Sequence, residues 1–426
     1  MSSPFDTLTA LPPGEVPPAR RLTSEAEAIA AAHEAAAAIA TISADPASNA
    51  QLPLRQAAIL SASGITAITV PRECGGIGAS VKTVVETVRI ISTADGGVGQ
   101  LLQIHHVMVR GLYNGFAPEV RDLLVRDVLA GKRFGNALAE VGGKNKFDHK
   151  TFAERRADGR LILNGSKFYS TGSYLAEWIS LSAASADGGI SILLNRHTPG
   201  LELVDDWRAF GQQNSVSGTV RFDDIEVDER FVPKRPPGAA MPRTGLTWPQ
   251  ILHAAIDTGI ARGALEAATA HLRNNTRPWV DANVDRAADE PHIIKTIGEY
   301  AVAVRSAEAL LAYAADQFDQ HKVDPDNKAL QDELILAVAT ARAASDHASL
   351  HVSSDMFALL GANASLSRWN LDRFWRNARV HTTHDPIRWR LHHVGNYYLN
   401  GVDPAEYGAA QRERRLHDTP AAKAVA

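Results

Sequence analysis

The order of helix-like and strand-like segments along the chain is the feature that most restricts its fold. Alanine-rich text with apolar residues near every 3.6 positions covers residues 20–133 and returns after residue 247. Between these regions, residues 134–236 hold five or more short stretches separated by turn dipeptides, such as Asp158-Gly159 and Asn164-Gly165. Strands gathered between two helical regions argue against a doubly wound sheet. We therefore expect an α+β protein with a central antiparallel β-domain.

Changes in composition predict the remaining boundaries. Prolines crowd residues 1–19, which favours a flexible tail, and residues 237–246 have the proline and glycine content of a linker. Residues 247–410 contain long periodic segments, among them 293–321 and 328–360, and predict a C-terminal four-helix bundle. The last helix should break at His384-Asp385-Pro386, because proline ends or kinks a helix. Residues 411–426 are expected to form a second flexible tail.

Composition excludes several classes of function. The 426 residues carry a net charge of −4, so no basic field recruits nucleic acid or a membrane surface. A single cysteine, Cys74, excludes an internal disulfide framework. Neither a leader peptide nor a long apolar span is apparent, so we expect a cytoplasmic protein. The GxGxxG, Walker, HExxH and GxSxG motifs are absent, which weakens nicotinamide-binding, NTPase, zinc-protease and α/β-hydrolase interpretations.

The densest group of chemically active residues is His381-x-x-His384-Asp385, at the predicted helix break. Imidazole titrates near neutral pH, so the pair suits acid–base chemistry. A metal site would need a third ligand, such as His392 or His393, and the spacing is a weak metal motif, so we expect none. The structural alternative is that His381 packs at the helix end and Asp385 caps the next helix.

Three segments of the predicted sheet could bind a flat ligand. Small residues around Asn136 would let backbone approach such a ligand, although an edge strand explains them equally. Tyr169 and Thr171 could stack on and hydrogen-bond a planar ring; the alternative is a hairpin strand with a buried Tyr169. Trp207 could wall a pocket, although core packing is the commoner role.

Four further residues are candidates with strong structural alternatives. His105 and His106 lie in an apolar helix, where most histidines are core or interface residues. Arg277 and Arg368 could clamp a phosphate, and surface ion pairing is the alternative for both.

Together these segments resemble the acyl-CoA dehydrogenase superfamily over nearly the whole chain. Asn164-Gly165-Ser166-Lys167, followed by Tyr169-Ser170-Thr171, resembles its flavin segment, and Pro71 to Gly76 resembles its Pro-x-x-x-Gly-Gly turn. The dehydrogenases' catalytic Tyr-Glu-Gly, however, is replaced by His384-Asp385-Pro386. That departure resembles the flavin-dependent monooxygenase branch, as do Gly135-Asn136-Ala137, Asp205-Asp206-Trp207 and the run 370–377.

The resemblance implies an N-terminal helical domain, a central β-domain and a C-terminal bundle, assembled as a homotetramer. It implies reduced FMN, delivered by a separate NAD(P)H:flavin reductase, that reacts with O₂ to a C(4a)-hydroperoxyflavin. This species would oxygenate a small organic substrate, with sulfur among the candidate atoms.

The resemblance also assigns roles to the candidate residues. His384 would be the proton donor or base, with Asp385 orienting it beside the substrate. Asn136 and Thr171 would hold the hydroperoxide and the flavin N(5) region. Tyr169 would lie against the ring. Trp207 would line the flavin site and the substrate cavity, Arg277 and Arg368 would bind the flavin phosphate, and His105 and His106 would contact the substrate.

Two other functions stay open on the sequence alone. An FAD-dependent acyl-CoA dehydrogenase would need its base on another helix. A non-catalytic flavin or acyl-CoA scaffold would have no use for His384 and Thr171.

Overall fold

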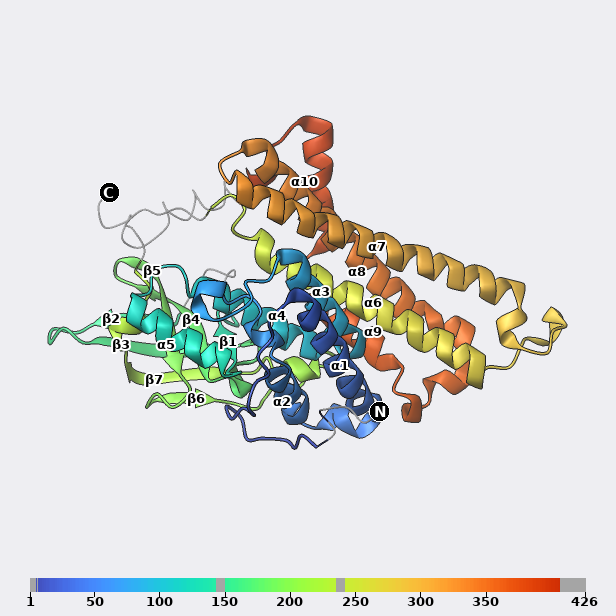
Figure 1. Cartoon of the computed structure of the whole chain (residues 1–426), viewed down its shortest axis with the longest axis horizontal. Helices are drawn as coiled ribbons and strands as arrows, with labels where there is room; N and C mark the ends of the chain where they lie inside the picture. Colours follow the sequence, from blue (N-terminus) through green and yellow to red (C-terminus); the bar gives the residue numbers. More distant parts are fainter. Residues whose placement is uncertain (1–4, 6, 143–149, 235–241, 407–426) are drawn as a thin grey trace.

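The computed structural model describes residue 5 and residues 7–142, 150–234 and 242–406. Figure 1 shows a sheet at one end of the molecule and long helices running away from it, with the N-terminal helices packed between. The five N-terminal helices are α1 (Glu25–Ala44), α2 (Leu54–Ser63), α3 (Val81–Ala94), α4 (Gly96–Gly111) and α5 (Pro118–Leu129). The C-terminal helices are α6 (Thr247–Asn275), α7 (Pro291–Val323), α8 (Lys328–Leu360), α9 (Asp372–Thr382) and α10 (Ile387–Asn400).

Helices α1, α3 and α4 begin at side-chain caps that the sequence supplies. Ser24 accepts a hydrogen bond from the backbone N–H of Glu27, whose carboxylate accepts from the N–H of Thr23. Asp95 caps α4 by accepting from the N–H groups of Gly97 and Val98. The start of α4 is therefore fixed, which matters because this helix contacts both the sheet and α9.

The central domain is one seven-stranded sheet within the described residues. Its strands are β1 (Phe134–Ala137), β2 (Phe152–Arg155), β3 (Leu161–Lys167), β4 (Trp178–Ser185), β5 (Gly188–Asn195), β6 (Leu201–Leu203) and β7 (Val220–Glu226). The order is β1-β4-β2-β3-β7-β6, with β5 on β4. The expectation of an antiparallel sheet holds for most pairs, but β1 and β2 both pair with β4 in parallel. The β2–β3 hairpin lies between β1 and β4 in the chain, and it provides the crossover that parallel strands require.

One turn prediction is wrong in the structure. Asn164-Gly165 lies inside β3, where the register against β7 shifts between Leu163 and Gly165. The Asn164 amide accepts from the N–H of Asp224 on β7 at 2.8 Å, so this pair forms a bulge between strands instead of a chain reversal. Gly165, at φ +138°, is needed there because a Cβ would lie 2.6 Å from the Thr151 Cα.

Helix α6 is the centre of the bundle and is buried over most of its length. Gly259 and Gly263 allow α3 to approach closely, since a Cβ at either position would lie 2.4 Å or 2.2 Å from a backbone oxygen of Arg89 or Thr93. The N-terminal helices and the bundle consequently share one continuous apolar core. Among the described residues, no helix is both long and apolar enough to cross a membrane.

The predicted helix break is confirmed. Helix α9 ends at Thr382 and α10 begins at Ile387, directly after Pro386. The tail prediction for residues 411–426 falls outside the described residues, as does much of the linker. Of the N-terminal tail, Phe5 and Pro17 are buried against the body of the protein.

Candidate active site

The sheet side of the site is built where β1 meets the segment after β3. The backbone N–H of Asn136 donates to the Thr171 carbonyl at 3.1 Å, and Ser173 Oγ donates to the Asn136 carbonyl at 2.7 Å. The Thr171 hydroxyl shares a 2.9 Å hydrogen bond with Ser217 Oγ. Asn136 and Thr171, which are 35 positions apart in the sequence, are therefore neighbours held by backbone contacts.

Two buried polar atoms at this junction lack a hydrogen-bond partner among the described residues. They are Asn136 Oδ1 and Ser170 Oγ. Buried polar atoms in folded proteins are usually satisfied, so this pair marks a place for polar atoms of a ligand. An isoalloxazine ring carries both N–H and carbonyl groups along one edge, and the residues present fit that group.

Tyr169 projects from this junction instead of packing inside it. Its backbone is in the left-handed region at φ 56°, which is uncommon for a bulky residue, and 52% of the residue is exposed. Its ring makes edge contacts with Phe168 at 4.7 Å and with Trp207 at 5.9 Å between centroids. The alternative of a buried strand tyrosine is thus excluded, and an aromatic face remains available.

The loop carrying Trp207 joins the sheet to the helices. Trp207 Nε1 donates to the Gln212 carbonyl at 2.9 Å, and the Gln212 N–H donates to Asn377 Oδ1 on α9 at 2.7 Å. Gly211 lies so close to α9 that a Cβ would be 1.9 Å from the Arg376 carbonyl oxygen. This contact fixes the position of α9 relative to the Thr171 junction. It thereby also fixes the histidines at the C-terminal end of α9 and just after it.

On the helix side, His384 follows α9 and lies against a buried histidine from α6. The rings of His384 and His253 are 4.4 Å apart between centroids and inclined by 34°. His253 Nδ1 is 2.9 Å from His381 Nε2, and His381 Nδ1 is 2.6 Å from Asp257 Oδ1. The second carboxylate oxygen of Asp257 accepts from Nη1 of Arg342, from α8.

Burial makes the charges of this cluster depend on one another. Burial alone would raise the pKa of Asp257, but the charges and hydrogen bonds of His381 and Arg342 outweigh it and hold the pKa below its ordinary value. Burial, reinforced by the neighbouring His384 and His381, holds the pKa of His253 well below that of a free histidine. The cluster therefore contains an ionised carboxylate and a neutral His253 at neutral pH.

The contacts of Asp385 do not suit a catalytic base. Its Oδ2 accepts from Gln250 Nε2 at 2.9 Å and from Arg390 Nη2 at 2.7 Å. Burial would raise the pKa of Asp385, but the nearby Arg390 charge and hydrogen bond keep it below the ordinary value. The structure thus gives Asp385 a local anchoring function between α6 and α10.

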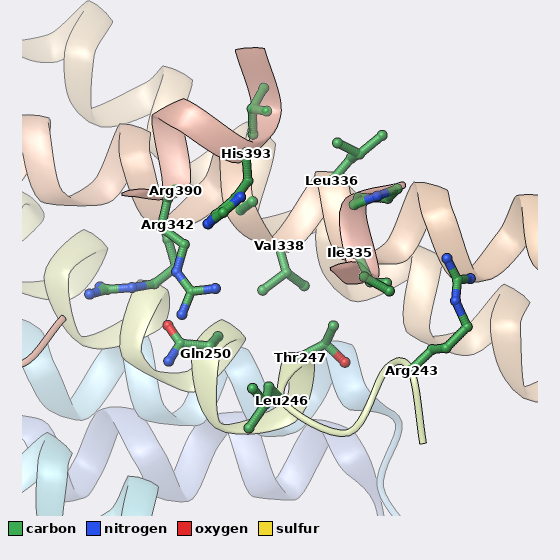
Figure 2. Close-up of a pocket in the computed structure, with 14 residues that line it drawn as sticks. Arg243, Leu246, Thr247, Gln250, Ile335, Leu336, Val338, Arg342, Arg390 and His393 are labelled. Atoms are coloured by element: carbon green, nitrogen blue, oxygen red, sulfur yellow. The ribbon is translucent and has the colours of Figure 1, made fainter. Parts of the chain in front are cut away.

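A small pocket of about 60 Å³ lies beside this cluster, between the start of α6, α8 and α10 (Figure 2). Its walls are largely apolar, with Leu246 and Val338 among them. Gln250, Arg342 and Arg390 line it too, so the polar anchors of the cluster form part of its wall.

The remaining candidates have other partners. His105 Nε2 is 2.8 Å from the Thr66 carbonyl, and its Nδ1 accepts from the N–H of Phe134 at 3.1 Å. Both nitrogens are engaged by backbone groups, which favours the core alternative; a substrate role for His105 or His106 stays a prediction. Arg277 and Arg368 are exposed near the far ends of α6 and α8, and Arg368 donates to Asn363. No group of His, Cys, Asp or Glu suited to a metal ion occurs among the described residues.

Sequence analysis missed four members of the cluster: Gln250, His253, Asp257 and Arg342. The first three are spaced at i, i+3 and i+7 within an apolar stripe of α6, and this periodic polar set inside a buried helix was the available indication.

Comparison with known proteins decides the family. A family model described as the acyl-CoA dehydrogenase C-terminal domain matches residues 251–389. A dibenzothiophene monooxygenase from Mycolicibacterium goodii is 32% identical over 357 residues, which cover 80% of this chain and 86% of that protein. The chain belongs to the flavin-dependent monooxygenases of the acyl-CoA dehydrogenase superfamily.

Further members of this family agree. The probable FMNH₂-dependent monooxygenase SfnC of Pseudomonas putida is 28% identical, covering 80% of this chain and 87% of that protein. FMN-bound TdsC from Paenibacillus sp. A11-2 has a TM-score of 0.83 at 26% identity, covering 89% of this chain and 98% of that one. A butyryl-CoA dehydrogenase structure from Megasphaera elsdenii, at 18% identity and a TM-score of 0.75, shares the fold alone.

Proposed function

We propose that this protein is a two-component, FMNH₂-dependent monooxygenase that oxygenates a small organic substrate at sulfur. The observation that carries the proposal is that a member of this family has both a histidine site on its helices and a fitting flavin site on its sheet. On the helices, the His384 ring contacts a network of buried histidines. On the sheet, the buried polar atoms of Asn136 and Ser170 that lack a hydrogen-bond partner mark a flavin site.

The flavin would be held by the sheet side. Asn136, Ser170 and Thr171 would bind the polar edge of the ring, and Tyr169 and Trp207 would cover it with aromatic surface. When bound, reduced FMN supplies the electrons that activate O₂. The protein has to keep bulk water from that centre, and the close contact between Gly211 and α9 would contribute to this.

His384 would exchange the proton that oxygen transfer requires. An imidazole has a pKa close to the working pH, which suits it to act as donor or base. Asp385 occupies the place that resembles the dehydrogenases' catalytic glutamate, but it is ionised and bonded to Gln250 and Arg390. A carboxylate with a lowered pKa is a poor base for a carbon-bound proton, so the acyl-CoA dehydrogenase alternative is not favoured.

Relatives support sulfur as the atom oxidised, since their names include dibenzothiophene monooxygenase and the methanesulfinate monooxygenase MsuC of Pseudomonas fluorescens. Aromatic surface near the junction favours an apolar substrate here. Phe210 and Trp375 are stacked at 5.8 Å, and 55% and 37% of these residues are exposed.

A homotetramer would explain the position of the two arginines. Arg277 and Arg368 lie by the ends of α6 and α8 that are remote from the sheet in Figure 1, so they would reach a flavin phosphate only from a neighbouring subunit. Large apolar residues on the bundle surface, including Val302, Leu391 and Leu399, support such contacts. A separate NAD(P)H:flavin reductase would supply the reduced FMN in the cytoplasm.

One assay separates the candidate functions. The purified protein is mixed with a flavin reductase, NADH, FMN and a panel of sulfides under ¹⁸O₂, and products are analysed by mass spectrometry. We expect one labelled oxygen per product and no reduction of an acceptor dye by acyl-CoA. Dye reduction by an acyl-CoA without labelled product would contradict the proposal.

A further inference from the structure

A line of buried polar side chains runs behind His384. It leads from Arg342 through Asp257 and His381 to His253, whose ring lies against His384. The side chains of Asp257 and His381 are 0% exposed, and that of Arg342 is 1% exposed. Helices α6, α8 and α9 each contribute to the line, so it forms only when the bundle is assembled.

The hydrogen-bond chemistry determines where the protons lie. Arginine only donates, so one Asp257 oxygen is occupied by Arg342 and the other accepts from His381 Nδ1–H. If His381 carries one proton, its Nε2 accepts from His253 Nδ1–H, whereas a doubly protonated His381 would donate from Nε2 and place the His253 proton on Nε2. The proposal takes the first arrangement, in which His253 is a neutral ring with its proton on Nδ1.

We propose that Asp257 and His381 are positioning residues that hold His253 as a neutral imidazole of fixed tautomer against His384. The exchangeable proton of the cluster is thereby confined to His384. The inference takes the catalytic role of His384 from the proposed function. It adds roles for Asp257 and His381, which the proposed function does not assign. Its physical basis is that two imidazoles with centroids 4.4 Å apart cannot both carry charge without strong repulsion.

The surrounding charges support the same assignment. Asp346 on α8 is near Asp257, and burial followed by that like charge raises the pKa of Asp346 to about 6. Arg379 on α9 also acts on Asp346. On the other side of His384, the Arg390–Asp385 pair is balanced in charge. Removing the Asp257 charge therefore leaves an excess positive charge, which lowers the pKa of His384.

Asp257→Asn makes a sharp test because Arg342 dictates its orientation. The amide oxygen must face Arg342, a pure donor, so the amide NH₂ faces His381 Nδ1. His381 then has to carry its proton on Nε2 and donate to His253 Nδ1. The substitution should consequently move the His253 proton from Nδ1 to Nε2.

The first readout uses the flavin-free protein with ¹⁵N-labelled histidine rings. Nuclear magnetic resonance should find the His253 proton on Nδ1 in the wild type and on Nε2 in Asp257→Asn, with His253→Gln assigning the signals. Asp346→Asn is the matched control, since it removes a buried carboxyl from the same region and should leave both tautomers unchanged. A wild-type His253 protonated on Nε2 would overturn the inference, even if Asp257→Asn failed to fold.

The second readout is the pH profile of oxygenation. In Asp257→Asn, substrate oxidation should fall by about tenfold or more and the kinetic limb due to His384 should move to lower pH. More of the consumed O₂ should appear as H₂O₂, while the FMN dissociation constant stays the same. An unmoved profile would contradict the inference. If the wild type oxygenates no substrate, the proposed function is wrong. The measurement of the His253 tautomer then still tests the positioning role of Asp257 and His381.

Discussion

Arg342→Met should destabilise the protein strongly because it removes the cation that binds Asp257 Oδ2. The Arg342 side chain is 1% exposed and that of Asp257 is 0% exposed, so water cannot replace the lost partner. Removing one member of a buried pair usually costs 3–5 kcal/mol, and the surviving His381 bond places the expected loss in the free energy of unfolding near the lower end, at about 3 kcal/mol.

A matched ion pair provides the control. Arg262 binds Glu308 through two hydrogen bonds, but the two side chains are 26% and 25% exposed. Arg262→Met should cost about 1 kcal/mol or less. The double variant Asp257→Leu/Arg342→Met should recover much of the loss, because no charge is then buried without its partner. Denaturant unfolding followed by circular dichroism measures the free energy of unfolding of these three variants.

The pH dependence gives a second check on the same residues. The folded-state pKa of Asp257 is lowered, so its contribution to stability is complete above the ordinary aspartate pKa and is lost as pH falls through the folded value. The Arg342→Met penalty should therefore shrink in acid. A penalty no larger than that of Arg262→Met at neutral pH would refute the electrostatic account of the cluster.

Three further predictions concern other parts of the molecule. His384→Ala should lower substrate oxidation and increase H₂O₂ release while the reductase continues to reduce FMN; unchanged coupling would remove the residue from the chemistry. Gly211→Ala should lower the melting temperature because its Cβ would collide with the Arg376 carbonyl, whereas Gly298→Ala on α7, where nothing lies within 4 Å, should not. Burial lowers the pKa of His105 to about 4, so stability should fall as pH drops from about 6.5 toward 4, and His105→Gln should weaken that dependence in thermal unfolding scans.

The fold could be predicted where local patterns decide it. Helix α8 spans the predicted 328–360, and the break before α10 follows from Pro386. The Asn164-Gly165 prediction failed because the partner of Asn164 is Asp224, 60 positions away, and the dipeptide alone does not reveal that contact. Strand β2 was not predicted, since four residues carry little periodicity.

The candidate site could be predicted only in part. Short motifs around Asn136, Thr171 and His384 led to the prediction of a sheet side and a helix side, and these residues stay predictions. The network behind His384 joins Asp257 to Arg342 across 85 positions and to His381 across 124. Such a pairing is created by helix packing, and no single segment contains it.

The central claim is that this protein protects a reactive oxygen species formed on reduced FMN until substrate arrives. Rapid mixing of the protein and photoreduced FMN with oxygenated buffer, without substrate, tests it directly. The account predicts a long-lived absorbance band of a flavin–oxygen adduct, which decays faster in His384→Ala and on addition of a sulfide. Immediate return to oxidised FMN with stoichiometric H₂O₂ would contradict it.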